Sequence, residues 1–211
     1  MSDYLTDEEQ LDRIKTWWEE YGRILIVALV IGIGGVVGWR WYDDTRAADI
    51  AAASDLYADF LDGDEAQREQ FAQTIGAQIP QSAYNVLVQL SEAAEAVNGE
   101  EFELAETQLR SAQSAATSDV LRDLVNVRLA RVLMQLDRTD EALTTLGQIR
   151  GEGFRPVVAE LKGDIHLSRG ERALAHESYR SALDAVIDLP RNTQRALLEL
   201  KVTDTADAAD A

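Results

Sequence analysis

Cysteine is absent from the 211-residue chain, which excludes disulfides, thiol chemistry and Cys-ligated metal sites. Histidine is scarce, and no further His or Cys accompanies His166 and His176 at metal-ligand spacing. We interpret both as helix-surface or packing residues. No nucleophile elbow, P-loop or E-x-x-H motif occurs either. The sequence therefore predicts no catalytic residue, no metal and no cofactor, in a protein that is not an enzyme.

Positive charge is also scarce, with 20 Lys and Arg against 38 Asp and Glu. Residues 43–211 hold 16 of those bases and 31 of those acids, which gives this part of the chain a net charge of −15. A surface with this charge disfavours nucleic acid as a partner. It also repels anionic lipid, so attachment to a membrane must come from another part of the chain.

One long apolar run is present, because Ile24 to Trp39 is sixteen residues without a charge. The aromatic residues at its two ends are Trp17, Trp18, Tyr21, Trp39, Trp41 and Tyr42. A helix over the run alone rises roughly 24 Å, and one that includes the aromatic residues covers roughly 39 Å, close to a bilayer with its interfaces. Trp and Tyr rings prefer those interfaces. We predict a transmembrane helix over residues 23–42.

Two alternatives fit the run less well. A cleaved signal peptide needs a basic segment before the run and small residues after it. Met1 to Arg23 instead holds seven acids and three bases, and bulky Trp39-Arg40-Trp41 stands at the end of the run. A buried core helix would not explain the two aromatic clusters or the glycines at positions 32, 34, 35 and 38. We therefore expect an uncleaved single-pass anchor.

The charges that flank the span predict its orientation. Three bases precede it and two, Arg40 and Arg46, follow it, which by a narrow margin favours residues 1–22 as a short cytoplasmic segment. Gly34 and Gly38 form a G-x-x-x-G pair, which permits close packing against another transmembrane helix and hence a homodimer. Ordinary glycine enrichment in membrane helices explains the pair equally well, and the sequence leaves both interpretations open.

Residues 43–202 repeat apolar residues at helical spacing and are rich in Ala, Leu and Glu, which predicts an all-α domain with short turns. The predicted helices cover about residues 46–61, 65–79, 81–97, 102–115, 120–136, 140–149, 156–168, 172–187 and 191–202. The tail of residues 203–211 alternates Ala and Asp and is predicted to be disordered.

Three of the predicted helix pairs carry equivalent residues in register. Small residues stand where the helices of a pair should cross, at Ala93, Ala130 and Gly163 and, twelve positions later, at Ala105, Ala142 and Ala175. The pairs are spaced by 37 and 33 residues, which bracket the tetratricopeptide period of about 34. In the last pair, Gly170, Tyr179 and Ala182 also stand at the expected offsets. We predict a tetratricopeptide-like α-helical solenoid, with an accidental match among Ala-rich helices as the alternative.

A stacked repeat array has a concave surface lined by the first helix of each pair. In the predicted register, that lining comprises Leu87, Leu90, Val97, Leu124, Val127, Arg131, Met134, Glu160, Asp164 and Leu167. Most of these are apolar, so an open groove would bind an extended or helical segment of another protein. The alternative is that the hairpin of residues 46–79 or the helix of residues 191–202 packs into the groove and completes the core.

Three short strings accompany the span and the repeats. They are Gly38-Trp39-Arg40-Trp41-Tyr42 at the end of the span, Asn126-Val127-Arg128-Leu129-Ala130-Arg131-Val132 in a repeat helix, and Arg150-Gly151-Glu152-Gly153-Phe154 between repeats. Their order and spacing over nearly the whole chain resemble the family of ancillary SecYEG translocon subunits of the YfgM type. Phe154 stands where this resemblance leads us to expect Trp, a change that keeps an aromatic ring.

The resemblance implies a bacterial inner-membrane protein with a single span, whose tetratricopeptide-like domain lies in the periplasm. It also implies association with the SecYEG translocon and with a membrane-anchored, parvulin-like periplasmic chaperone, and assistance to secretory proteins as they leave the channel. The residues by themselves predict only a membrane-tethered helical-repeat interaction domain. A scaffold or regulatory adaptor for another envelope assembly is the alternative function.

Overall fold

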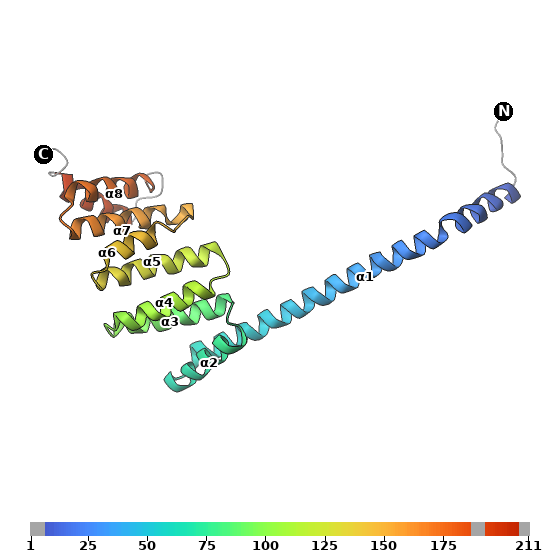
Figure 1. Ribbon diagram of the computed structural model, residues 1–211, viewed down its shortest axis with the longest axis horizontal. Coiled ribbons are helices and arrows are strands. Elements are labelled where there is room, and N and C mark those ends of the chain that lie inside the picture. Colours follow the sequence, from blue (N-terminus) through green and yellow to red (C-terminus); the bar gives the residue numbers. More distant parts are fainter. Residues whose placement is uncertain (1–6, 187–192, 207–211) are drawn as a thin grey trace, which may run out of the picture. The chain divides into compact units, whose positions relative to one another are not determined.

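The computed structural model describes residues 7–186 and 193–206. Within these ranges the chain forms nine α-helices and one short 3-10 helix, and no strand (Figure 1). Internal contacts divide the chain into two compact units, Met1–Asp55 and Leu56–Ala211. The prediction of an all-α protein is confirmed.

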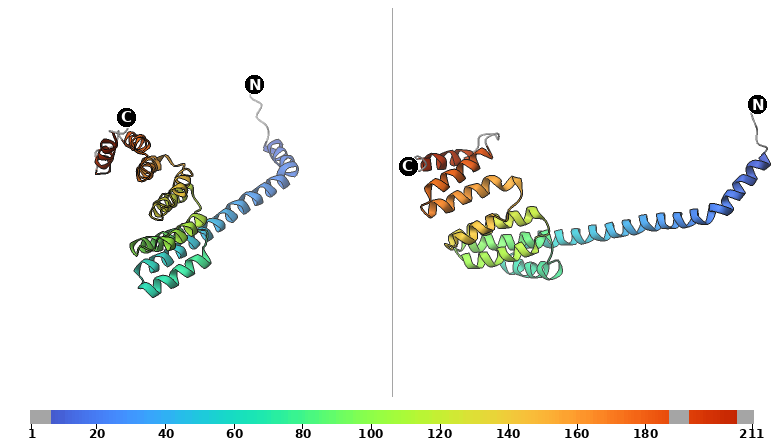
Figure 2. Two further views of the ribbon diagram at one scale, coloured as in Figure 1. Left: turned by 60° about the vertical axis from the view of Figure 1, so that its left-hand side comes forward. Right: turned by 45° about the horizontal axis from the view of Figure 1, so that its top comes forward.

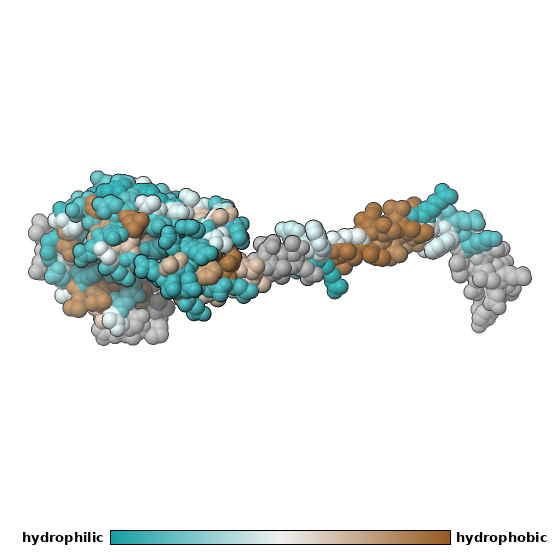
Figure 3. Space-filling view, turned by 90° about the horizontal axis from the view of Figure 1, so that it is seen from below, coloured by the Kyte–Doolittle hydropathy of each residue, from teal (hydrophilic) through white to brown (hydrophobic). Residues whose placement is uncertain are grey.

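The first unit consists of most of α1 (Asp7–Asp62). Within the described residues, Lys15–Asp43 is the one helical segment long and apolar enough to cross a membrane. Its large apolar side chains are exposed, with Val30 at 63% and Ile31 at 69%, and they form the brown band along α1 in Figure 3. The predicted span therefore coincides with a helix that presents its apolar side chains outward, as a lipid-facing helix does.

The sequence prediction placed a separate helix at residues 46–61, and this was wrong. α1 continues unbroken through the span and through these residues to Asp62. The physical reason is that no Pro or Gly occurs between residues 39 and 62 to interrupt the backbone hydrogen bonds. The helix ends where Gly63 follows and Asp64 caps the next helix, in a capping box with Gln67.

The second unit is an array of helix pairs, which stack in chain order (Figures 1 and 2). Its elements are the end of α1 with α2 (Glu65–Gln78), α3 (Ala83–Asn98) with α4 (Phe102–Ala115), α5 (Asp119–Gln135) with α6 (Thr139–Leu146), α7 (Arg155–Ser168) with α8 (Arg172–Asp184), and α9 (Thr193–Thr205). The 3-10 helix η1 (Glu152–Phe154) leads into α7. One continuous apolar core runs from Val86 on α3 to Ile165 on α7.

The turns inside the three full pairs confirm the repeat register. Each has one residue with left-handed backbone at the same place, with φ of 59° at Glu100, 57° at Asp137 and 77° at Gly170. The following amide donates to the carbonyl five residues back at 2.8 Å, 2.9 Å and 2.8 Å in the three turns. These positions are 37 and 33 residues apart, the same spacings as the crossing residues.

The crossing residues are buried as the register requires. Ala93 is 3% exposed, and Ala105, Ala130, Ala142 and Ala175 are fully buried. Their short side chains let the two helices of each pair pack closely. In the last pair, the place of the small residue is taken by Gly163, which lies against the ring of Tyr179.

The end of the domain lies further along the chain than predicted. α9 continues to Thr205, past the predicted limit at residue 202, because the Thr205 side chain is fully buried. Its hydroxyl donates to the Lys201 carbonyl at 2.8 Å and lies 3.2 Å from Nδ1 of His176. The remaining tail prediction, residues 207–211, lies outside the described residues, as do residues 187, 191 and 192 of two predicted helices.

Candidate protein-binding site

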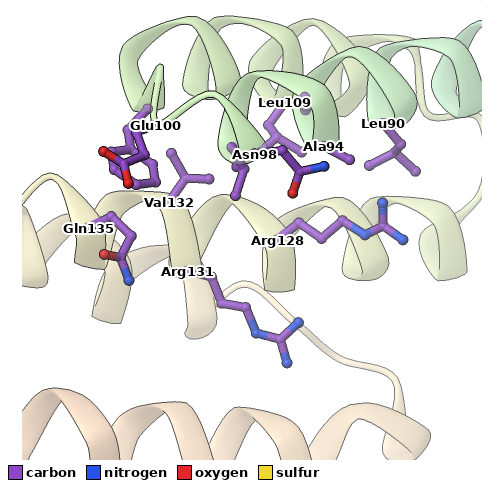
Figure 4. A pocket seen from close by; sticks show the side chains of 12 residues that line it. Leu90, Ala94, Asn98, Glu100, Leu109, Arg128, Arg131, Val132 and Gln135 are labelled. Atoms are coloured by element: carbon purple, nitrogen blue, oxygen red, sulfur yellow. The ribbon is translucent and has the colours of Figure 1, made fainter.

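A cleft of about 790 Å³ opens between α3, α4 and α5 in the second unit (Figure 4). It is lined by Leu90, Ala93, Ala94, Val97, Asn98, Glu100, Phe102, Leu109, Arg128, Arg131, Val132 and Gln135. The floor is apolar and buried, as Leu90, Leu109 and Val132 are between 1% and 4% exposed. Ala93 and Ala94 on α3 contribute only methyl groups to this lining.

The rim of the cleft is polar and uneven in charge. Figure 4 shows Glu100 and Gln135 at one end and Arg128 at the other, with Asn98 between them. Arg131 extends from α5 away from α3. All five side chains are exposed. The cleft thus has an apolar floor and a rim of amide, carboxylate and guanidinium groups. Protein-binding clefts commonly have this combination.

Three of the ten residues predicted to line a groove do line this cleft, namely Leu90, Val97 and Arg131. Val127 is instead buried in the core at 4% exposure, and Leu124 and Met134 pack against that core. Leu87 and Leu167 are half-buried and do not contribute to the cleft. The residues predicted to form one groove are therefore divided between the cleft and the core. Whether the cleft binds a protein stays a prediction.

The last two predicted groove residues, Glu160 and Asp164, are covered by α9. Lys201 Nζ donates to Glu160 Oε1 at 2.9 Å and to Asp164 Oδ1 at 2.7 Å. Burial lowers the pKa of Lys201, but these two carboxylates outweigh it and raise the pKa above its ordinary value. The helix predicted at residues 191–202 thus packs onto this end of the array. This agrees with the alternative prediction, in which that helix covers part of the groove.

The first hairpin does not fill the cleft. Phe60 of α1 and Ile75 of α2 pack with Val88 in a separate apolar cluster. No residue of α1 or α2 lines the cleft. Among the described residues, neither α2 nor α9 fills the cleft, whereas Lys201 of α9 contacts Glu160 and Asp164 on α7.

The α3–α4 turn and Arg128 also line the cleft, and neither was predicted from the sequence. The predicted lining came only from the first helix of each pair, whereas Glu100 and Phe102 lie in the turn and at the start of the second helix. The signal for Arg128 was its spacing from Arg131, since residues three apart share one face of a helix.

Gly34 and Gly38 lie on α1 in the first unit. A Cβ atom built on either would meet nothing within 4 Å, so both leave open space on the helix surface. Such a surface allows another helix to approach closely. That this surface makes a homodimer or contacts another span stays a prediction.

Two polar contacts around a carboxylate hold the pairs together, and the first joins α4 to the α5–α6 turn. Glu106, whose side chain is 12% exposed, accepts from Arg110 Nε at 2.8 Å and from Arg138 Nη1 at 2.5 Å. Burial by itself raises the pKa of the Glu106 carboxyl, but the hydrogen bonds from Arg110 and Arg138 outweigh it and hold the pKa below its ordinary value.

We expect Glu106→Gln to lower the free energy of unfolding at neutral pH by about 1–2 kcal/mol, because two charge-assisted hydrogen bonds are weakened. Since the pKa is lowered in the folded state, the unfolded carboxyl takes up a proton first as the pH falls below about 4.5. The stabilisation is therefore present above that pH and disappears below it. Urea unfolding of the full chain in detergent between about pH 7 and about pH 3 measures the difference.

Glu103→Gln is the matched control, because Glu103 lies on the same helix, is exposed and makes no ion pair with a described residue. Its effect should be near zero at every pH. A difference between wild type and Glu106→Gln that stays constant with pH would show that the carboxylate charge does not stabilise the fold.

The second contact, which is buried, joins α5 to the loop that precedes α7. Asp123 is 5% exposed, and its Oδ2 accepts from the Gly151 amide at 2.8 Å and from the Arg150 amide at 3.3 Å. A Cβ atom at position 151 would lie 2.9 Å from that oxygen, so the loop needs glycine there. This contact explains why the string that begins at Arg150 has glycine as its second residue.

No group of three or more His, Asp or Glu side chains that could hold a metal ion occurs among the described residues. His166 Nδ1 lies 2.6 Å from Glu171 Oε2 across the α7–α8 turn, and His176 contacts α9. Both histidines thus take part in contacts between helices.

Comparisons with known proteins cover both the apolar helix and the repeats. The protein-family model described as a tetratricopeptide repeat-like domain matches residues 15–207. The ancillary SecYEG translocon subunit of Haemophilus influenzae is 34% identical over 182 residues, which cover 84% of this chain and 89% of that protein. The protein of the same name from Escherichia coli K12 is 30% identical over 186 residues, covering 87% and 90%. No solved structure matches the chain significantly.

A more distant relative, the ancillary SecYEG translocon subunit of Neisseria gonorrhoeae, is 25% identical over 210 residues and matches 96% of this chain and 98% of its own length. The similarity thus extends from the span to the last helix, and the relatives are similar in length to this chain. The chain belongs to the tetratricopeptide repeat-like family of the ancillary SecYEG translocon subunits.

Proposed function

We propose that this chain is an ancillary subunit of the SecYEG translocon, which works by binding proteins rather than by catalysis. The observation that carries the proposal is the match to relatives of that name over most of both chains. The single apolar helix supplies a membrane anchor, and the open cleft supplies a surface for a partner. Anchoring raises the local concentration of the domain beside the channel, so modest affinities suffice.

The finer proposal is a single-pass inner-membrane protein with residues 1–22 in the cytoplasm and the repeat domain in the periplasm. There the domain contacts a membrane-anchored, parvulin-like chaperone as well as the translocon, and assists secreted proteins as they emerge. The flanking charges support this orientation, since the bases before the span outnumber those after it.

Orientation can be tested cleanly because the chain has no cysteine, so an introduced cysteine is its single thiol. Ser111 lies exposed on α4, and Ser111→Cys should react with a membrane-impermeant maleimide in cells with a permeable outer membrane and an intact inner membrane. Ser2→Cys should react only after the inner membrane is broken. The opposite pattern would place the repeat domain in the cytoplasm.

The partner is tested by affinity purification of the full tagged chain from mildly solubilised inner membranes. We expect the channel subunits and a membrane-anchored chaperone to co-purify, and an equally tagged, unrelated single-pass protein to recover neither. Recovery of a different envelope complex without channel subunits would favour the scaffold or adaptor function instead.

A further inference from the structure

Arg128 and Arg131 are arginines at the cleft that have no acidic partner among the described residues. Arg110, Arg122, Arg138, Arg155 and Arg169 each pair with a carboxylate within 4 Å. The side chain of Arg150, in the loop before α7, makes no ion pair with a described residue. Arg128 and Arg131 make no ion pair or hydrogen bond with any residue that the structure describes, and both are exposed. Both therefore place positive charge beside the cleft that no described carboxylate neutralises.

These two arginines stand beside an apolar floor of limited size. Leu90, Leu109 and Val132 form buried apolar surface next to them, and the cleft of about 790 Å³ has room for a few side chains of a bound segment. A guanidinium group binds a carboxylate through two parallel hydrogen bonds. The site therefore suits a ligand that has a carboxylate next to a large apolar side chain.

The negative charge of Glu100, at the end of the cleft opposite Arg128, determines which way round such a ligand binds. Glu100 is held there by a left-handed backbone with φ of 59°, and Figure 4 places it at the opposite end from Arg128. A carboxylate is repelled by Glu100 and attracted by the arginines. Because the side chains at both ends are exposed, the cleft does not close around a chain terminus and accepts a segment that continues in both directions.

We propose that the cleft between α3, α4 and α5 binds an extended internal segment of a partner protein, with an Asp or Glu side chain on Arg128 and Arg131 and an apolar side chain on Leu90 and Val132. The proposal deepens the proposed function and rests on it for the identity of the complex in which the partner occurs. It assigns the site by charge complementarity, because this is the place on α5 where an acidic ligand meets unpaired positive charge.

The test uses a photocrosslinking amino acid at Ala94, which lines the cleft and is exposed, in the full chain in its native membrane. Adducts are digested and the crosslinked partner segment is sequenced by mass spectrometry. We expect internal segments with an Asp or Glu within about three residues of an apolar crosslinked residue, since an extended chain rises about 3.3 Å per residue.

Charge reversal at the two arginines, R128E with R131E, should reduce the adduct yield at least about tenfold, as expected when charge-assisted hydrogen bonds are replaced by repulsion. The matched control reverses two bases outside the cleft, K162E with R180E, which changes the net charge equally and should leave the yield within about twofold. Equal unfolding midpoints for both double variants show that the fold is retained.

The inference is overturned if Ala94 gives no adduct, or if R128E with R131E leaves the adduct yield unchanged. It is also overturned if the crosslinked segments contain no Asp or Glu. Adducts formed only with protein C-termini, with a second copy of this chain or with the chain's own tail would overturn it as well. Co-purification of the channel subunits is measured in the same cells. If the channel subunits co-purify but the crosslinking results contradict the prediction, only this inference is wrong. If the channel subunits do not co-purify with the wild-type chain, the proposed function itself is wrong.

Discussion

Gly163→Ala is expected to lower the free energy of unfolding by about 2–3 kcal/mol, because the added methyl group has no space. A Cβ atom at this position would lie 2.5 Å from two ring carbons of Tyr179. The ring cannot move away easily, since it is 1% exposed and its hydroxyl donates to Asp164 Oδ1 at 2.8 Å. Ala has a higher helix propensity than Gly, which stabilises the helix by at most about 1 kcal/mol. The destabilisation by overpacking is larger than this gain.

Urea unfolding of the full chain in detergent, followed by circular dichroism, measures this loss. Gly76→Ala is the control, because Gly76 is also helical and the nearest atom to its built Cβ lies 3.8 Å away. It should leave the stability unchanged or raise it by up to about 1 kcal/mol. The cost of Gly163→Ala should also shrink when Tyr179 is replaced by Leu. A Gly163→Ala variant as stable as wild type would refute the close packing of α7 on α8.

Asp123→Ala is expected to destabilise the domain by about 2–3 kcal/mol, because it removes the acceptor of two backbone amides. The Gly151 and Arg150 amides donate to the Asp123 carboxylate, and this contact fixes the loop between the second and third full pairs. Without it the loop must find water or rearrange. Protease cleavage within residues 149–154 should therefore become faster, in addition to the loss in unfolding free energy.

Asp123→Asn separates the hydrogen bond from the charge, since its carbonyl oxygen can still accept from the Gly151 amide. We expect it to lose about 1 kcal/mol and to keep the loop resistant to protease. Asp119→Ala is a control on the same helix, with a side chain that is 92% exposed and should matter little. If Asp123→Ala and Asp119→Ala behave alike, the loop does not depend on the buried carboxylate.

The repeat register could be predicted from sequence because it depends on local features. Small residues at the crossings and turn residues at fixed offsets determine each pair, so the spacing of Ala93, Ala130 and Gly163 locates three hairpins. α4 was predicted with the bounds that the structure has. Each such feature involves residues within one hairpin, and its pattern is visible along the chain.

The candidate site could be predicted only in part, because it depends on contacts between pairs. Register alone placed Leu90, Val97 and Arg131 on one surface, and all three line the cleft, while their role in binding stays a prediction. The coverage of Glu160 and Asp164 depends on Lys201, which is about 40 residues away along the chain, and no short-range pattern indicates that contact. Asp123 was missed for the same reason, since an acid in a helix looks like solvated surface until its loop partner is known.

Photocrosslinking in cells from the span, with the photoreactive residue at Gly34 or Gly38, tests the central claim most directly. No described side chain lies within 4 Å of a Cβ atom at either position, so the probe meets no other side chain of this chain. A subunit of the ancillary translocon type should give adducts with a channel subunit, identified by mass spectrometry. Reproducible adducts with another envelope complex, and none with the channel, would contradict the account and assign the chain to a scaffold or adaptor function.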